Sequence, residues 1–484
     1  MVIPLVNKYR FSPNTDNAYI SLITYLGNNG TFIKQLKNPI NLIHKMQEFA
    51  TSHSLRNGIF DLLSSANIAT EQNIELLDYT IDLFNKNGLS SDYYGYHNID
   101  HELEVTYVTL VSAIYSLNKK KFELEDVEYL FASALLHDFD PDKAADRPHE
   151  KSVIDFINQD NKIQQLLRDV GIDSSLVCAL ISRTVYPWSG KIKKDTQEVI
   201  QNYLISSSYT RGDTEKQDHF MKLGHFLSIS DRIGGYSLGD FSKAMEMAKM
   251  NAHASGWHPA FIVRRAVSFF EDMLNNESAM CEQVLNGIPK HMRKNFLDNI
   301  VSFMKLRQEE IQIYNKFTYE GLKLVPKIEK NTDHDEFIDA LLEIYKELPK
   351  PLQFTREDFV ESIHDKDTIL NTLRIGDPRG PIIGFAKGGP LEKYNFQLKT
   401  DDDNNGKNNT AFLEPLALKN GYWGFHGGRE IRQLFLMQVQ SQGYEYMTSF
   451  ALRDVIEYRI KNEPGIEFVK KFDPERWDYY RMTL

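Results

Sequence analysis

The chain has 484 residues, about three times the usual size of a domain, so we expect two or three separate cores. It holds 56 Lys and Arg against 67 Asp and Glu, a net charge of −11, and 42% of its residues are hydrophobic. These values exclude a single small binding module and a mainly disordered chain. They also argue against general nucleic-acid binding, because that needs a basic surface.

The cysteine content and the hydropathy pattern indicate where the protein works. Cys178 and Cys281 are the only cysteines, which argues against a disulfide framework and a cysteine zinc cluster and favours a reducing compartment. No apolar run approaches the roughly 18 residues of a membrane span, and the start of the chain lacks the pattern of a signal peptide. We therefore expect a cytoplasmic protein that makes no membrane contact.

Residues 41–317 have the pattern of successive helices, since apolar residues recur at every third and fourth position and Gly and Pro are few. An all-α bundle is predicted over residues 56–318, after a helical extension over 1–55. Two stripes are predicted to face its core: Ile74, Leu77, Ile81 and Phe84 in one, and Val105, Val108, Leu110, Val111 and Tyr115 in the other.

The pattern changes after Phe317, and residues 323–484 are predicted to form an α/β or α+β domain. Strands are expected at 322–328, 369–375, 381–386, 412–418, 446–451 and 479–482, and helices at 335–348, 428–442 and 455–462. The polar run 401–409 is predicted to be a mobile hairpin loop without a binding role.

Histidine and aspartate residues in the helical half form the most informative group. They occur as Tyr96-His97-Asn98-Ile99-Asp100-His101, His137-Asp138, His149-Glu150 and Ser230-Asp231-Arg232. His97 and His101 would share one helix face if the helix began by Tyr96. Imidazole nitrogen and carboxylate oxygen suit zinc, iron, manganese and other divalent ions, and two ions bridged by a carboxylate can promote hydrolysis of a phosphate ester.

Each of these segments has a structural interpretation when it is taken alone, because a histidine on an apolar helix face is usually not a ligand. The order of His, then His-Asp, then a distant Asp resembles the HD superfamily of metal-dependent phosphohydrolases, over about residues 60–315. The resemblance implies an all-α HD domain that binds one or two divalent ions (Zn, Fe, Mn or Mg). The metal ligands that it implies are His101, His137, Asp138 and Asp231.

The segment Tyr96–His101 also resembles the Tyr-His-Asn signature of the cyclic-nucleotide phosphodiesterases. This resemblance implies that His97 is the general acid for the leaving oxygen and that Asp138 also contacts a second ion. It further implies a second-ion or water-ordering role for Asp140, His149 and Glu150. The substrate implied is a small phosphorylated molecule, with nucleotides as the first class to consider.

The chain departs from the phosphodiesterase pattern after Asp140, where Pro141 and Asp142 replace an expected His-Pro-Gly. Cyclic nucleotides therefore stay one candidate beside linear nucleotides and phosphorylated metabolites. Arg183 and Trp188 could line the same pocket, but a helix end with an aromatic core anchor is the favoured interpretation.

The order of elements in the second domain resembles the GNAT acyltransferase fold, through strands 381–386 and 412–418, a glycine turn and helix 431–442. The resemblance implies that the turn, with Gly427 and Gly428, holds the pyrophosphate of acetyl-CoA. Glu430 and Arg432 stand where that motif has small residues, and a carboxylate there disfavours an anion. The domain could therefore bind acetyl-CoA through a shifted loop, or have lost the cofactor and act as a sensor or scaffold.

Three functions stay open at this point. The first is a metal-dependent phosphohydrolase, and the second is a GNAT-type acyltransferase regulated by a nucleotide-binding or metal-binding helical domain. The third is an interaction protein with two degenerate modules, against which the complete set of HD ligands argues. The sequence leaves the oligomeric state open.

Overall fold

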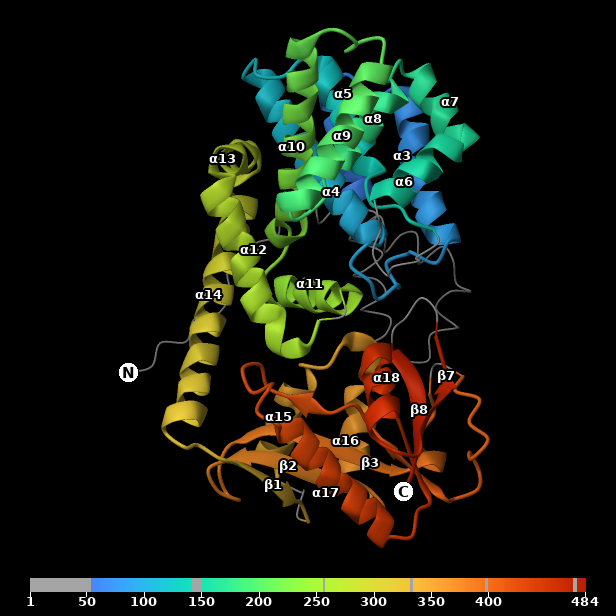
Figure 1. Ribbon diagram of the computed structural model, residues 1–484, viewed down its shortest axis with the longest axis vertical. Coiled ribbons are helices and arrows are strands. Elements are labelled where there is room, and N and C mark those ends of the chain that lie inside the picture. The colour runs from blue at the N-terminus through green and yellow to red at the C-terminus, as the bar shows by residue number, and fades with distance from the viewer. Residues whose placement is uncertain (1–53, 142–149, 256, 331–333, 397–398, 473–476) are drawn as a thin grey trace, which may run out of the picture.

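The computed structural model describes residues 54–141, 150–255, 257–330, 334–396, 399–472 and 477–484. A helical bundle lies at one end of the molecule and a mixed β-sheet with its own helices at the other (Figure 1). The long helix α14 (Lys290–Tyr319) runs along one side from the bundle toward the sheet. The predicted change from helices to strands therefore falls just after α14.

The helical part begins with a helix over residues 54–65. The helices that follow it before α14 are α3 (Glu71–Lys86), α4 (Ile99–Asn118), α5 (Leu124–Leu135), α6 (Glu150–Gln159), α7 (Asn161–Asp169), α8 (Ser174–Ser182), α9 (Gly190–Ser206), α10 (Thr214–Ser237), α11 (Phe241–Ala254), the 3₁₀ turn η2 (Pro259–Phe261), α12 (Ile262–Asn276) and α13 (Ser278–Gly287). One core cluster runs through them from Ile59 to Phe303.

Helix α4 is the central helix of the bundle, since it packs against α5, α10 and α13. Helix α10 comes close to it at Gly234, where an added Cβ would lie 3.3 Å from Cγ2 of Val105 and 3.4 Å from its Cα. The predicted stripe on α4 is buried at Val105 and Val108, but Tyr115 is 39% exposed. That part of the prediction is wrong because Tyr115 lies near the C-terminal end of α4, beyond most of the packing.

The second part contains one sheet with the order β1-β2-β3-β4-β6-β8-β7, to which β5 adds by pairing with β3. Its strands are β1 (Leu324–Ile328), β2 (Ile369–Ile375), β3 (Ile382–Pro390), β4 (Thr410–Leu413), β5 (Ala417–Leu418), β6 (Tyr446–Leu452), β7 (Ile466–Lys470) and β8 (Trp477–Thr483). All pairs are antiparallel except β4 with β6. This mixed sheet agrees with the predicted α/β or α+β class.

Helices cover both faces of the sheet. They are α15 (Asp335–Tyr345), α16 (Arg356–His364), α17 (Gly427–Ser441) and α18 (Arg453–Asn462), with the 3₁₀ turns η3 (Lys350–Leu352) and η4 (Leu391–Lys393). Strand β2 shows the two faces, because Ile369 and Leu373 belong to the core cluster of α17 and α18 whereas Leu370 belongs to that of α15 and α16. Alternation along the strand thus fixes which helices lie on which side.

The structure differs from the predicted elements of this domain in three places. The single strand expected over 412–418 is divided into β4 and β5, because Glu414 and Pro415 interrupt it and Pro415 has no N–H for the ladder. Helix α16 and strand β7 were not predicted. Only Phe359 and Ile363 are buried in α16, and only Ile466 in β7, so their apolar periodicity is weak.

The polar run 401–409 lies between β3 and β4 but is only partly exposed. Asp402 is 9% exposed, and its carboxylate accepts hydrogen bonds from Tyr479 Oη at 2.9 Å and from Arg481 at 3.1 Å. The run is a loop between the antiparallel strands β3 and β4, as predicted, and the Asp402 carboxylate attaches it to β8. Within the described ranges, no helix combines the length and the apolar character that crossing a bilayer requires.

Candidate metal centre

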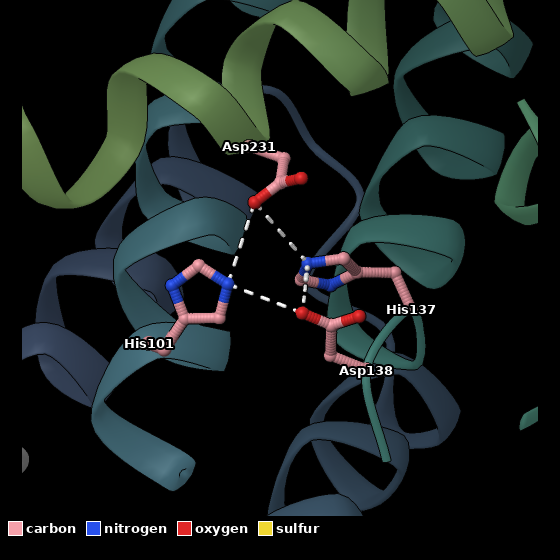
Figure 2. A group of neighbouring side chains, drawn as sticks. All are labelled: His101, His137, Asp138 and Asp231. Carbon is pink, nitrogen blue, oxygen red and sulfur yellow. Dashed lines mark ion pairs between the residues drawn. The ribbon is translucent and has the colours of Figure 1, made fainter. Parts of the chain in front are cut away.

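Four predicted side chains from three segments of the chain meet in the helical bundle. His101 lies in the first turn of α4, His137 and Asp138 follow the end of α5, and Asp231 lies in α10 (Figure 2). One ligand atom from each residue lies within 4.8 Å of the others. Segments 36 and 94 residues apart in sequence (101 to 137, and 137 to 231) are thus brought to one point by the packing of α4 against α5 and α10.

The Tyr-His-Asn segment positions His101. The Asn98 side chain is the N-cap of α4 and accepts a hydrogen bond from the His101 backbone N–H at 3.1 Å. The Tyr96 ring packs against the His101 imidazole, with 4.3 Å between the two ring centroids. The expected shared helix face of His97 and His101 required a helix that begins by Tyr96. Helix α4 begins at Ile99, so this condition is not met and His97 precedes the helix. The two imidazoles are nevertheless 5.9 Å apart between centroids.

The protonation of His137 follows from its hydrogen bond. Its Nδ1 lies 2.8 Å from the carbonyl oxygen of Ala134, which can only accept, so Nδ1 carries a proton. Glu102 Oε2 lies 3.3 Å from the same nitrogen. With Nδ1–H fixed in this way, Nε2 faces Asp138 and Asp231 and is the nitrogen available to a metal ion.

Three of the four histidine–aspartate distances in this group match the coordination sphere of one cation, and the fourth is slightly longer. Asp138 Oδ2 lies 3.2 Å from His101 Nε2 and 3.3 Å from His137 Nε2, and Asp231 Oδ1 lies 3.3 and 3.7 Å from the same two atoms. Ligands held tetrahedrally at about 2.0–2.1 Å from an ion are separated by about 3.3–3.4 Å. The two buried Nε2 atoms make no hydrogen bond with any described residue. Two imidazoles with two carboxylates favour zinc, iron or manganese over magnesium.

The charges of this centre are mutually dependent. Burial lowers the pKa of His101, but contacts with Asp138 and Asp231 outweigh it and raise the value to about 9. Burial disfavours the ionised form of Asp231, yet contacts with His101 and His137 bring its pKa well below the usual range. The protein groups alone therefore form a network of two carboxylates and protonated imidazoles, and one divalent cation would supply the same charge as two protons.

His97 lies at the edge of this centre. Its Nε2 is 3.6 Å from Asp138 Oδ2, and 17% of its side chain is exposed. Burial lowers the pKa of His97 to about 4, although Asp138 acts in the opposite direction. The imidazole is therefore neutral near pH 7 in the protein alone, whereas the general-acid role that the resemblance implies needs its protonated form.

The remaining predicted residues do not join the cluster in the described chain. Asp140 is buried two residues after Asp138, and Glu150 begins α6, but neither belongs to the group of converging ligand atoms. His149 lies outside the described residues. The sequence interpretation missed Glu102, which is fully buried and accepts from the Asp138 backbone N–H at 3.4 Å. Its signal was a carboxylate within an otherwise buried helical stretch.

The glycine turn of the sheet domain has a packing explanation. Gly427 begins α17, and a Cβ there would lie 2.4 Å from Leu373 Cδ2 and 2.7 Å from Leu324 Cδ1. The preceding Phe425 stacks on Phe317 of α14, with 4.3 Å between centroids. A Cβ on Gly428 would meet Leu418 at 3.6 Å, which is an ordinary contact. Gly427 thus allows α17 to lie close to β1 and β2.

The two substitutions in the expected pyrophosphate motif have different surroundings. Glu430 is exposed in the first turn of α17, so its charge lies near the end of the helix that an anion would approach. Arg432 is 8% exposed and donates to Glu463 at 3.0 Å, so its side chain is part of the packing against the sheet. Neither residue supplies a group for a phosphate.

No protein-family model and no curated protein matches this chain. Solved acetyltransferase structures are similar to its C-terminal third. One is the crystal structure of a protein assigned as a phosphinothricin N-acetyltransferase, with 16% sequence identity. The match covers 34% of this chain and 99% of that chain, and its TM-score is 0.24. Another is a GNAT family N-acetyltransferase from Escherichia coli in complex with CoA, with 17% sequence identity. The match covers 34% of this chain and 82% of that chain, and its TM-score is also 0.24.

A third structure is an acetyltransferase from Salmonella typhimurium with its cofactor acetyl-CoA, at 10% identity, with 34% of this chain and 94% of that chain covered and a TM-score of 0.25. All three TM-scores lie far below 0.5. Whether this chain binds a coenzyme therefore has to be judged from the residues of its own turn.

Proposed function

We propose that the helical part is a metal-dependent phosphohydrolase that acts on a small phosphorylated molecule, with nucleotides as the first substrate class. The observation that carries this proposal is the convergence of His101, His137, Asp138 and Asp231 at ligand spacing, with two buried imidazole nitrogens left without hydrogen bonds among the described residues. In the protein alone these nitrogens face the oxygens of Asp138 and Asp231 and are held there by protonation, and a bound cation would replace those protons.

The roles of the individual residues follow from their contacts. A divalent ion held by the four ligands would lower the pKa of a bound water and polarise a phosphoryl oxygen. Glu102 and the Ala134 carbonyl hold the His137 ring in one tautomer, and Asn98 holds the start of α4 that carries His101. His97 would give a proton to the leaving oxygen. A substrate phosphate beside it would favour the imidazolium, which burial alone disfavours.

Substitution of the ligands tests this proposal. The purified protein is expected to contain about one or two divalent ions per chain, and to hydrolyse p-nitrophenyl phosphate, its bis ester or a nucleotide in a metal-dependent way. Asp138→Asn and Asp231→Asn should each lose the metal and at least about 100-fold in kcat/KM, with unchanged far-UV circular dichroism. Asp195→Asn, at an exposed carboxylate of α9, is the matched control and should behave like the parent protein.

His97→Ala separates catalysis from metal binding. It should keep the metal and lower kcat by about 100-fold or more, as expected for loss of a general acid. Loss of metal in this variant would make His97 a ligand instead. Full activity in both aspartate variants would refute the hydrolase.

Acyl transfer by the sheet domain is the second candidate function. One feature of the sheet favours it. The parallel pairing of β4 with β6 ends at Phe412 and Thr448, and the chain after β4 forms β5, which pairs with β3 instead. Glu430 and the packed Gly427 argue against an anion site in the adjacent turn. Acetyl-CoA at 100 times its Kd would stabilise the protein by about 2.7 kcal/mol, so a rise in melting temperature would support this function and no change would oppose it.

A further inference from the structure

A second site lies on the helical bundle, in a half-open pocket of about 880 Å³. The pocket is formed by the segment after α8, the start of α9, one face of α10 and the junction of α12 with α13. Its volume is that of sites that enclose a small organic ligand. None of the four residues of the metal centre lines it.

The pocket and the metal centre lie on different sides of α10. The lining residues Asp218, Met221, Lys222 and His225 follow helical spacing and so share one face. Asp231 comes six residues after His225, which places the two side chains about 120° apart around the helix. A ligand in this pocket would therefore be separate from a ligand at the metal centre.

Arg183 is the central group of this pocket. It is 4% exposed, and its guanidinium lies 3.8 Å above the Trp188 ring. Its described polar contacts are long, namely 3.5 Å to Ser228 Oγ and 3.6 Å to Glu277 Oε2. A buried guanidinium has five N–H donors, so most of these donors are available to an anion that enters the pocket.

The carboxylate nearest to Arg183 is already neutralised by other groups. Glu277 accepts from Arg232 at 2.6 Å and lies 2.7 Å from His225 Nε2. The lining has three basic side chains, Arg183, Lys193 and Lys222, and three acidic ones, Asp218, Asp272 and Glu277. Because Glu277 is paired with Arg232 behind the lining, the surroundings of Arg183 favour a ligand with a negative charge.

Aromatic groups supply the other half of the recognition surface. Trp188 is held flat by Arg183 on one side and is partly exposed, and Tyr186 is 38% exposed beside it. Tyr186 is itself held by an edge contact with Phe269, 5.5 Å between centroids. Rings that are fixed in this way and remain accessible are surfaces on which a planar group can stack.

We propose that this pocket binds a phosphorylated ligand with a planar ring, the chemistry of a mononucleotide, with the phosphate on Arg183 and the ring beside Trp188. The inference does not depend on the proposed hydrolase, because it uses none of the metal ligands. Such a ligand would bind whether or not the metal centre is active.

Isothermal titration calorimetry with adenosine 5′-monophosphate and with inorganic phosphate tests the proposal, in the full chain and with EDTA present. The nucleotide is expected to bind at least about five times more tightly than phosphate, since stacking on an aromatic ring contributes about 1–3 kcal/mol. Trp188→Leu should remove this difference and leave phosphate binding unchanged. Arg183→Met should abolish the binding of both.

Variants at the half-buried Lys193 and the exposed Lys222 guard against misfolding of Arg183→Met. Lys193→Met and Lys222→Met should fold normally and each weaken both ligands about two- to five-fold, whereas Arg168→Met, at an exposed arginine of α7, should have no effect. Asp138→Asn should bind the nucleotide like the parent protein. Absence of binding at millimolar concentration, equal affinity for the two ligands, or loss of binding in Asp138→Asn with retention in Arg183→Met would overturn the proposal.

Discussion

The two parts of the molecule treat their buried charges differently. In the sheet domain, Lys387 is 1% exposed and pairs with the equally buried Glu414, while Ser362 Oγ accepts a second hydrogen bond from the lysine at 2.5 Å. In the helical bundle, Asp138 and Asp231 approach two histidines whose Nε2 atoms lack hydrogen bonds with described residues. The sheet pair joins one cation to one carboxylate, although Glu414 Oε2 also lacks a hydrogen bond with described residues, whereas the helical cluster brings four potential ligand atoms together and would gain from an added cation.

This difference shows how a structural cluster can be told from a candidate binding centre. Both clusters contain buried charged side chains, so burial alone does not distinguish them. The geometry does, because the sheet pair is a direct contact between one cation and one carboxylate, whereas four potential ligand atoms of the helical cluster all lie within 4.8 Å of one another. The following substitutions test the comparison, beginning with the largest expected effect.

Glu414→Ala should cost about 3–5 kcal/mol in the free energy of unfolding, because it leaves the buried Lys387 without its counter-ion. Urea denaturation measures this loss. Replacing both partners, as Lys387→Met with Glu414→Leu, should recover most of it. Glu361→Ala, at an exposed carboxylate of α16, is the control and should change stability by less than about 0.5 kcal/mol. A small loss in Glu414→Ala would show that the pair is not the stabilising contact inferred here.

Gly427→Ala and its neighbour Gly428→Ala separate packing from cofactor binding. The first substitution places a Cβ against Leu373 and Leu324 and should cost about 1–3 kcal/mol, since a packed interface does not accept an extra methyl group. The second meets only Leu418 at ordinary contact distance and should be nearly neutral in thermal denaturation. If the turn served acetyl-CoA, Gly428→Ala would instead impair the coenzyme-induced rise in melting temperature.

Asn98→Ala should cost about 1 kcal/mol through loss of the N-cap of α4, and should also weaken metal binding because His101 lies in the turn that it caps. Thr70→Ala is a matched control, since Thr70 caps α3 by accepting from the Asn73 backbone N–H at 3.1 Å. The two variants should lose similar stability in urea, but only Asn98→Ala should lower metal affinity in a chelator competition. Equal metal affinity in both would contradict the positioning role of Asn98.

The smallest effect is expected from His219, a half-exposed residue whose Nε2 lies 2.7 Å from the carboxylate of the buried Asp126. This hydrogen bond raises the pKa of His219 above its ordinary value, so the stabilisation is fully present below the unfolded-state pKa and is lost as the pH rises through the folded-state pKa. His219→Gln should therefore be destabilised by up to about 0.5–1 kcal/mol near pH 5.5 and by less near pH 8.5. A larger difference at the higher pH would have the wrong sign.

Much of the candidate centre could be predicted from residue types and their order along the chain. His101, His137, Asp138 and Asp231 were all candidates before any geometry was known, and the strand 369–375 agrees with β2 at both ends. Local patterns carry such information because each helix or strand needs its own apolar periodicity to bury one face. Glu102 was missed because its contact with His137 joins two segments, and its local signal, a carboxylate in a buried helical stretch, does not identify the partner.

The sequence by itself determined which part of the chain is helical and which contains strands, and it contained the residue types that bind metal ions. Only the tertiary structure decided that His97 precedes α4, that Gly427 is required by close packing against Leu373, and that Arg183 faces a pocket. Distances between side chains far apart in the chain are set by how whole helices pack. That packing reflects the summed burial of many residues, which no single motif contains.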